Sequence, residues 1–225
     1  SMTQLKAVDF FCGAGGMSCG FAQAGVEILA GIDIEIQFKE TYLANHKGSK
    51  FINRDITRFE AEELQSELKL KKFDDDLVFI GCSPCQYWSQ INTDKRKSSY
   101  TNNLIHDFQR FVKFFRPGHV VVENVPGILN KSNNHFLLSF LDFLTFHGYQ
   151  YVYEIIKTEN YGVPQARKRF VLIASRVKEK ISFPAPDTSS EDMTVAKFIG
   201  ETNGFPKIND GHKDDSPFLH TTAAL

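Results

Sequence analysis

The sequence predicts an α/β fold in which a mostly parallel sheet of seven strands is flanked by helices. Two observations predict it: short runs of apolar and β-branched residues recur along the chain, and amphipathic helical stretches separate them. The expected strands are residues 6–11, 28–33, 51–55, 77–81, 119–123, 149–157 and 169–175.

Two expected helices have the clearest signal. Apolar residues at helical spacing over 104–115 form one stripe, which ends before Pro117. A second stripe lies between residues 136 and 146 and is closed by Gly148. After about residue 175, prolines and glycines interrupt a polar stretch, which indicates a linker that leads to another module.

Composition limits the possible partners. The chain has 225 residues, of which 42% are hydrophobic, so one sizeable core is expected. Because the formal net charge is only −1, a nucleic acid would have to be held by local basic groups such as 95–97 and 167–169.

Four cysteines without an amino-terminal leader favour reduced thiols. We therefore expect a soluble, intracellular protein.

A glycine-rich turn follows the first expected strand. The string VDFFCGAGGMSCGF leads from that strand into Gly13, Gly15 and Gly16. In a doubly wound fold this turn is where a cofactor meets the sheet. The string is not GxGxxG, because Ser18 occupies the third place, so a tight turn without any ligand is the alternative.

Two carboxylates strengthen the case for a nucleoside ligand. Asp33 ends the second expected strand, where a carboxylate can accept both hydroxyl groups of a ribose. Asp55 closes the third, where it can accept from an adenine amino group. Either residue alone is more often a turn former or a helix cap, and Thr57 and Arg58 suit a helix start. Together the two carboxylates favour adenosine.

Three further strings carry reactive side chains. GCSPCQYWS places Cys85 directly after a buried strand, VVVENV carries Glu123, and QARKRF carries Arg167 and Arg169. A thiolate nucleophile, a partly buried carboxylic acid and a guanidinium are the groups that attack on a heteroaromatic base requires. Cys82 and Cys85 also form a CxxC pair, but a redox or zinc site is disfavoured because no second CxxC exists.

These strings resemble the cytosine-5 DNA methyltransferase family over about residues 6–175. The resemblance implies a Rossmann-like methyltransferase fold that uses S-adenosylmethionine and no metal. It implies that residues 3–176 are the catalytic domain. Matching cofactor-contacting positions are Phe11, Gly13, Gly15, Gly16, Asp33, Ile34, Asp55, Ile56 and Leu104.

The resemblance also implies a mechanism. Cys85 adds to ring carbon 6 of cytosine, which makes carbon 5 nucleophilic enough to take the methyl group. Glu123 lies beside ring nitrogen 3, while Arg169, Arg167 or both lie beside the carbonyl oxygen. The partner is double-stranded DNA, and the target base must be flipped out of the stack.

The chain departs from the family after residue 176. Residues 177–225 resemble only a linker and the start of the target-recognition region, and the later family motifs do not appear. We expect a fragment of a bacterial restriction-modification enzyme that acts in the cytoplasm at the nucleoid, and weak or no methylation by this chain alone. The alternatives are a transfer RNA cytosine-5 methyltransferase and a catalytically silent binding module.

Overall fold

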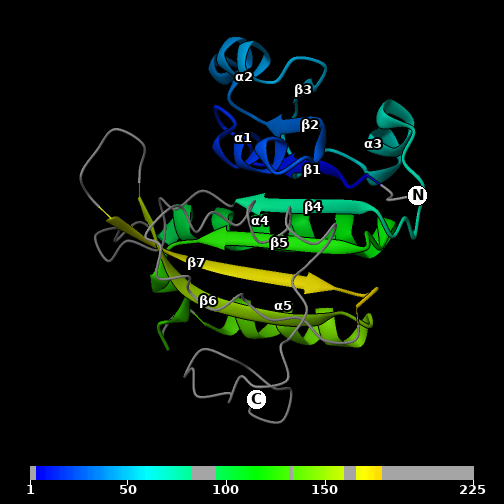
Figure 1. The fold of residues 1–225 in the computed structure, drawn as a ribbon. Coiled ribbons are helices and arrows are strands. Elements are labelled where there is room, and N and C mark those ends of the chain that lie inside the picture. The colour runs from blue at the N-terminus through cyan, green and yellow to red at the C-terminus, as the bar shows by residue number, and fades with distance from the viewer. Residues whose placement is uncertain (1–3, 83–94, 132–133, 160–165, 179–225) are drawn as a thin grey trace, which may run out of the picture.

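The structure is a computed structural model that describes residues 4–82, 95–131, 134–159 and 166–178; of residues 95–103, 158–159 and 166–167 it describes the backbone alone. Its centre is a seven-stranded sheet with the order β3-β2-β1-β4-β5-β7-β6 (Figure 1). The strands are β1 (Lys6–Phe10), β2 (Glu27–Asp33), β3 (Lys50–Asn53), β4 (Leu77–Cys82), β5 (His119–Asn124), β6 (Gln150–Glu159) and β7 (Ala166–Ser175).

All seven expected strands are confirmed, with shifts at their ends. The third ends at Asn53, so Asp55 lies two residues beyond the strand that it was expected to close. Neighbouring strands among β1, β2, β3, β4 and β5 are all parallel to each other, whereas β7 is antiparallel to both β5 and β6. The antiparallel β7 brings its first residues beside the carboxyl end of β5, which matters for the site described below.

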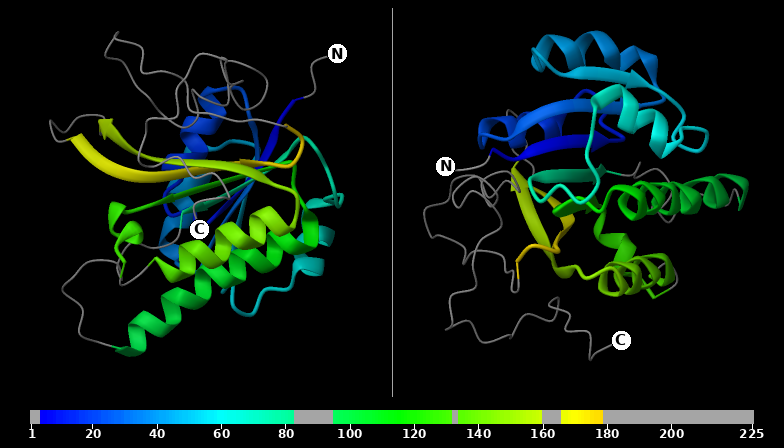
Figure 2. Two further views of the ribbon diagram at one scale, coloured as in Figure 1. Left: turned by 90° about the horizontal axis from the view of Figure 1, so that it is seen from below. Right: turned by 90° about the vertical axis from the view of Figure 1, so that its right-hand side faces the viewer.

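Helices cover both faces of this sheet. They are α1 (Gly16–Gln23), α2 (Lys39–Asn45), α3 (Ala61–Leu68), α4 (Lys95–Phe115) and α5 (His135–Phe146), with short 3₁₀ segments η1 (Ile36–Phe38) and η3 (Pro126–Leu129). The two expected helices correspond to α4 and α5, which lie side by side on one face (Figure 2). The α4 prediction began nine residues too late, since its first turns lack the apolar stripe.

Alternation along the strands creates two separate cores. In β4, Leu77 and Phe79 face α4 and α5, while Val78 and Ile80 face the side of α1. The same alternation in β5 places Val122 on the α4 side. Consecutive side chains at the ends of these strands therefore lie alternately on the α4 and α5 face and on the α1 face of the sheet.

Candidate functional site

The carboxyl ends of the parallel strands bring the expected site residues to one edge of the sheet. The chain leaves β1 into the glycine turn, β2 ends at Asp33, and β4 ends three residues before Cys85. Glu123 lies one residue before the end of β5. This edge is where ligands bind in open α/β sheets.

The glycine turn is joined to β2 by Asp33. The Gly13 backbone N–H donates to Asp33 Oδ2 at 2.8 Å, and the Glu35 N–H donates to Oδ1 at 2.9 Å. Each carboxylate oxygen has two lone pairs and so keeps acceptor capacity for a ligand hydroxyl. Ile34, the next residue, is 51% exposed at this edge. An exposed apolar side chain beside a partly satisfied carboxylate suits a ligand with a sugar and a flat ring.

Backbone angles explain why the turn needs glycine. Gly13 and Gly15 have φ of 53° and 94°, a region that side-chain-bearing residues seldom adopt. A Cβ atom at Gly15 would lie 2.4 Å from His46 Nε2, too close for any contact. The same His46 nitrogen lies 3.0 Å from the Gly15 carbonyl oxygen. Phe11 also has a positive φ, of 59°, so the chain turns sharply from its first residue after β1.

A buried acid lies beneath the turn. Asp9 of β1 is fully buried, and its Oδ2 accepts from Ser18 Oγ at 2.6 Å. Ser18 Oγ lies in turn 3.1 Å from the Tyr42 hydroxyl. Burial raises the pKa of Asp9 to about 7, with Glu123 and Asp33 adding to the rise and the Ser18 hydrogen bonds opposing it. Ser18, which breaks the nucleotide fingerprint, thus has a structural role that a glycine could not fill.

The remaining expected cofactor residues differ in exposure. Asp55 is half-buried, and its Oδ1 accepts from the N–H and the hydroxyl of Thr57 at 3.0 and 2.7 Å. The turn-former alternative for Asp55 is therefore seen, whereas a helix start at Thr57 is not, because α3 begins at Ala61. Ile56 and Leu104 are buried in the main core, so a ligand could reach only their edges.

Glu123 and Arg169 meet at the opposite end of the same edge. Arg169 Nε lies 3.2 Å from Glu123 Oε1, and both side chains are about one-fifth exposed, at 20% and 23%. The Cys82 thiol is 3.5 Å from Glu123 Oε2. The three residues lie on adjacent strands and on the α1 face of the sheet, since Cys82 pairs with Glu123 in register. The sequence analysis assigned Glu123 and Arg169 to the same base without predicting a contact between them, and it did not place Cys82 beside Glu123, which only the strand register reveals.

Cys85 lies outside the described residues, as does the side chain of Arg167. The Arg167 backbone, in β7, pairs with Thr158 of β6 and lies two residues from Arg169. Strand alternation puts positions 167 and 169 on the same face.

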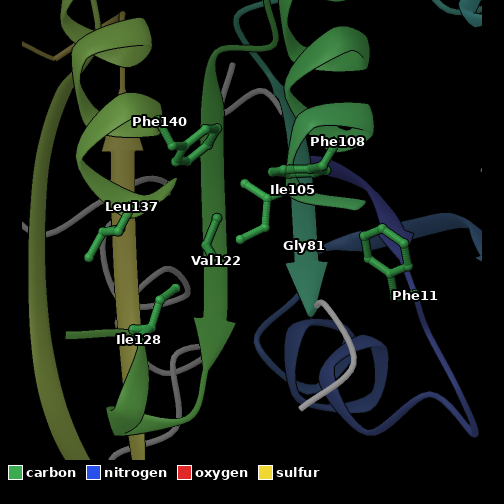
Figure 3. Close-up of a pocket in the computed structure, with 8 residues that line it drawn as sticks. All are labelled: Phe11, Gly81, Ile105, Phe108, Val122, Ile128, Leu137 and Phe140. Carbon is green, nitrogen blue, oxygen red and sulfur yellow. The ribbon is translucent and has the colours of Figure 1, made fainter. Parts of the chain in front are cut away.

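A small apolar pocket lies near this edge (Figure 3). Gly81 and Val122 line it, and these positions point to the α4 and α5 face, away from Glu123. The pocket is therefore separate from the Glu123–Arg169 pair. The residues that line it are Phe11, Gly81, Ile105, Phe108, Val122, Ile128, Leu137 and Phe140.

The described part of the chain has neither a cluster of metal ligands nor a helix that could span a membrane. Within it, no group of three or more His, Cys, Asp and Glu side chains is arranged to hold a metal ion. No helix there is both long and apolar enough to cross a lipid bilayer.

The chain was compared with known proteins. A model of the family described as C-5 cytosine-specific DNA methylase matches residues 5–220. Type II methyltransferase M1.HphI of Haemophilus parahaemolyticus is 32% identical over 209 residues, covering 92% of this chain and 54% of that protein. Type II methyltransferase M.XorII of Xanthomonas oryzae is 31% identical over 212 residues, covering 92% and 49%. The chain thus spans about half the length of the curated relatives it matches.

Solved structures share the fold. A candidate DNA modification methyltransferase encoded within an E. coli prophage has a TM-score of 0.67 and 26% identity, covering 80% of this chain and 49% of that one. The Dnmt2 methyltransferase of S. pombe has a TM-score of 0.60 at 20% identity, covering 79% and 52%. The sheet order, the carboxyl-edge site and the family match over residues 5–220 lead to one conclusion: the chain belongs to the C-5 cytosine-specific DNA methylase family.

Proposed function

We propose that this chain carries the chemistry of a DNA cytosine-5 methyltransferase that takes its methyl group from S-adenosylmethionine and attacks the base through Cys85. The observation that carries the proposal is the contact between Arg169 and Glu123. It lies at the edge of the sheet where β4 ends, three residues before Cys85. The relatives described above are type II methyltransferases, so the proposed setting is a restriction-modification system that acts on double-stranded DNA.

Residues of the glycine turn and β2 fit the proposed cofactor. Asp33 retains acceptor capacity for ribose hydroxyls while it fixes Gly13. A side chain at position 15 would collide with His46, so only the backbone of Gly15 lines this part of the turn. Exposed Ile34 and half-buried Phe11 offer apolar surface to a purine ring. When bound, S-adenosylmethionine supplies a methyl group on a positively charged sulfur, which is an electrophile.

Cys85 opens the reaction by covalent addition. Its thiolate sulfur forms a bond to carbon 6 of cytosine, and the electron pair of the C5–C6 double bond shifts towards nitrogen 3 and the carbonyl. Glu123, as the carboxylic acid, donates its proton to nitrogen 3, while Arg169 donates hydrogen bonds to the carbonyl oxygen. In the present structure Arg169 contacts Glu123 instead. When the base enters, Arg169 therefore leaves Glu123 and donates to the carbonyl oxygen of the base. Glu123 then takes its proton from solvent.

The return steps restore the ring. Once carbon 5 carries the methyl group, a base removes the proton from carbon 5, and its electron pair re-forms the C5–C6 double bond. The bond between carbon 6 and the Cys85 sulfur breaks, the thiolate leaves, and nitrogen 3 returns its proton to Glu123. The thiolate is thus regenerated for the next turnover.

The test is trapping of the covalent adduct. This chain is incubated with S-adenosylmethionine and a duplex oligonucleotide that contains 5-fluorocytosine, whose fluorine prevents loss of a proton from carbon 5. Because weak or no methylation is expected of this chain alone, the same incubation is made with the chain joined to the carboxyl-terminal half of a type II relative, and intact-protein mass spectrometry of that protein should show it plus one oligonucleotide strand. The adduct should be absent in Cys85→Ser, because a hydroxyl is a much weaker nucleophile than a thiolate.

Cys19→Ser is the matched control. Cys19 is an exposed free cysteine on α1 that contacts none of the proposed catalytic groups, so its variant should form the adduct like the unaltered chain. An adduct that persists in Cys85→Ser would overturn the assigned nucleophile. No adduct even when the chain is joined to the carboxyl-terminal half of a type II relative would overturn the proposed mechanism.

A further inference from the structure

We infer that Arg110 of α4 is a positioning residue for adenine recognition, because it holds in place the loop that carries Asp55 and Ile56. The inference rests on the proposed function, in which Asp55 accepts from the adenine amino group. Arg110 lies six residues after Leu104 on α4, so one helix supplies both an expected cofactor contact and the support for the loop beside it.

The geometry is that of a clamp on two carbonyl groups. Arg110 Nη2 donates to the Ile56 carbonyl oxygen at 2.9 Å and to the Phe59 carbonyl oxygen, also at 2.9 Å. These two carbonyls flank the short turn between β3 and α3. A single guanidinium nitrogen therefore joins both ends of that turn to α4, across 54 and 51 residues of sequence.

Acidic and aromatic side chains surround the Arg110 guanidinium. Asp107, one helical turn earlier, lies 3.4 Å from Arg110 Nη2, and Glu60 lies 3.7 Å from Nη1. The guanidinium packs 4.8 Å from the ring centre of buried Phe111. The Arg110 side chain is 34% exposed, so its hydrogen bonds are partly shielded from water. Charge-assisted bonds of this kind are stronger than neutral ones.

Apolar packing anchors the loop as well, since Ile56 and Phe59 are buried in the main core, but the other hydrogen bonds near Asp55 stay within the loop. The Arg58 N–H donates to the Asp55 carbonyl, and Thr57 holds Asp55 Oδ1. These bonds shape the turn internally but do not attach it to the sheet. Attachment to α4 through the Ile56 carbonyl fixes the residue directly after Asp55, and so the direction in which the carboxylate points.

A purely structural role predicts something different from a positioning role. If Arg110 only stabilised the fold, its loss would lower the melting temperature and weaken every adenosine-like ligand equally. If it positions Asp55, its loss should weaken a ligand with the adenine amino group more than one without it. The ratio of the two affinities therefore separates the two roles.

The experiment is isothermal titration calorimetry with S-adenosylhomocysteine and with S-inosylhomocysteine, in which a carbonyl oxygen replaces the amino group. The unaltered chain should prefer the adenine ligand. Arg110→Met, which keeps the length and loses the hydrogen bonds, should reduce that preference about tenfold, the worth of one hydrogen bond to a charged group. Arg110→Lys keeps the charge and should lose less. Arg58→Met is the matched control, since Arg58 lies on the same loop with an exposed side chain and should leave the preference unchanged.

Each outcome distinguishes a positioning role of Arg110 from a purely structural one. An unchanged preference in both Arg110 variants, with adenine binding intact, would overturn the positioning role and leave the proposed function standing. If neither the unaltered chain nor that chain joined to the carboxyl-terminal half of a type II relative binds either ligand, the proposed cofactor is wrong and the role of Arg110 fails with it. Should Arg110→Met fail to fold by circular dichroism, the preference measured in Arg110→Lys gives the answer.

Discussion

At the scale of single residues, the buried Asp9 is the most unusual ionisable group in the described part of the chain. It has no exposed surface, and within that part no hydrogen bond reaches its Oδ1. The other ionisable groups that act on it are Glu123 and Asp33, which are acids, and its neighbours Cys12 and Tyr42 have pKa values raised by burial. A neutral Asp9 avoids an isolated charge beneath the glycine turn.

Asp9 should make the chain less stable as pH rises. Its pKa is raised from 3.8 to about 7, so between those values the folded state keeps a proton that the unfolded state has released. The free energy of unfolding then falls as pH rises through this interval, by on the order of 4 kcal/mol, and falls no further above it. Asp9→Asn has no such proton, so its stability relative to the unaltered chain should increase with pH.

Urea unfolding of both proteins at pH 5 and pH 8 measures this difference. Buried His119, whose pKa is lowered to about 3, contributes a slope of opposite sign, but it does so in both proteins and cancels. A stability difference that stays constant between the two pH values would mean that Asp9 is already ionised in the fold.

At the scale of elements, the glycine turn and α2 behave as one unit. Tyr42 within α2 and His46 directly after it have ring centres 4.6 Å apart, and both would collide with a side chain at Gly15. Asp33 binds the same turn from β2. The turn is therefore shaped by two elements that come later in the chain, and its own sequence specifies only the freedom to adopt that shape.

Gly15→Ala should be far more damaging than Gly48→Ala. Both glycines have φ near 90°, at 94° and 91°, so both substitutions strain the backbone by about 1 kcal/mol. At Gly48 a Cβ atom would meet nothing within 4 Å, whereas at Gly15 it would meet His46 at 2.4 Å. We expect Gly15→Ala to cost about 2 kcal/mol more and to abolish S-adenosylhomocysteine binding.

Urea unfolding and calorimetry on the two variants provide the comparison. Similar unfolding free energies in the two variants would show that α2 moves aside without cost. In that case α2 would not define the floor of the turn.

At the scale of the whole molecule, aromatic packing on the α4 and α5 face holds the strands to the helices. The Phe10 ring of β1 lies within 5.3 Å of the ring centres of Phe79, Phe108 and Phe111. Phe111 also contacts Phe59, next to the loop that Arg110 clamps. The centre of this core thus lies directly beneath the carboxyl edge where the site residues meet.

Phe111→Ala should lower the free energy of unfolding by about 3 to 5 kcal/mol, because a fully buried ring leaves a cavity among aromatic neighbours. Phe146→Ala is the control, since Phe146 is 84% exposed at the end of α5 and should change stability by no more than about 0.5 kcal/mol. Guanidinium unfolding of both variants measures the contrast. A comparable loss of unfolding free energy in both variants would mean that the exposed end of α5 also stabilises the fold.

The sequence by itself determined the strands, the two long helices and the order of the site strings, because each depends on local periodicity and on residue type next to a strand end. It also placed the glycine turn, Asp33 and Glu123 at strand ends, and the carboxyl ends of parallel strands share one edge. The domain division at residue 176 and the roles of all the catalytic and cofactor-binding residues stay predictions.

Only the tertiary structure decided the contacts between distant elements. The antiparallel course of β7 brings Arg169 to Glu123, strand register brings Cys82 to the same carboxylate, and α4 reaches the Ile56 carbonyl through Arg110. Such contacts join residues 41 to 54 positions apart, and no local pattern encodes them. They arise because the sheet order and the helix packing choose which strand ends and loops become neighbours, and that choice is made by burial of the two cores as a whole.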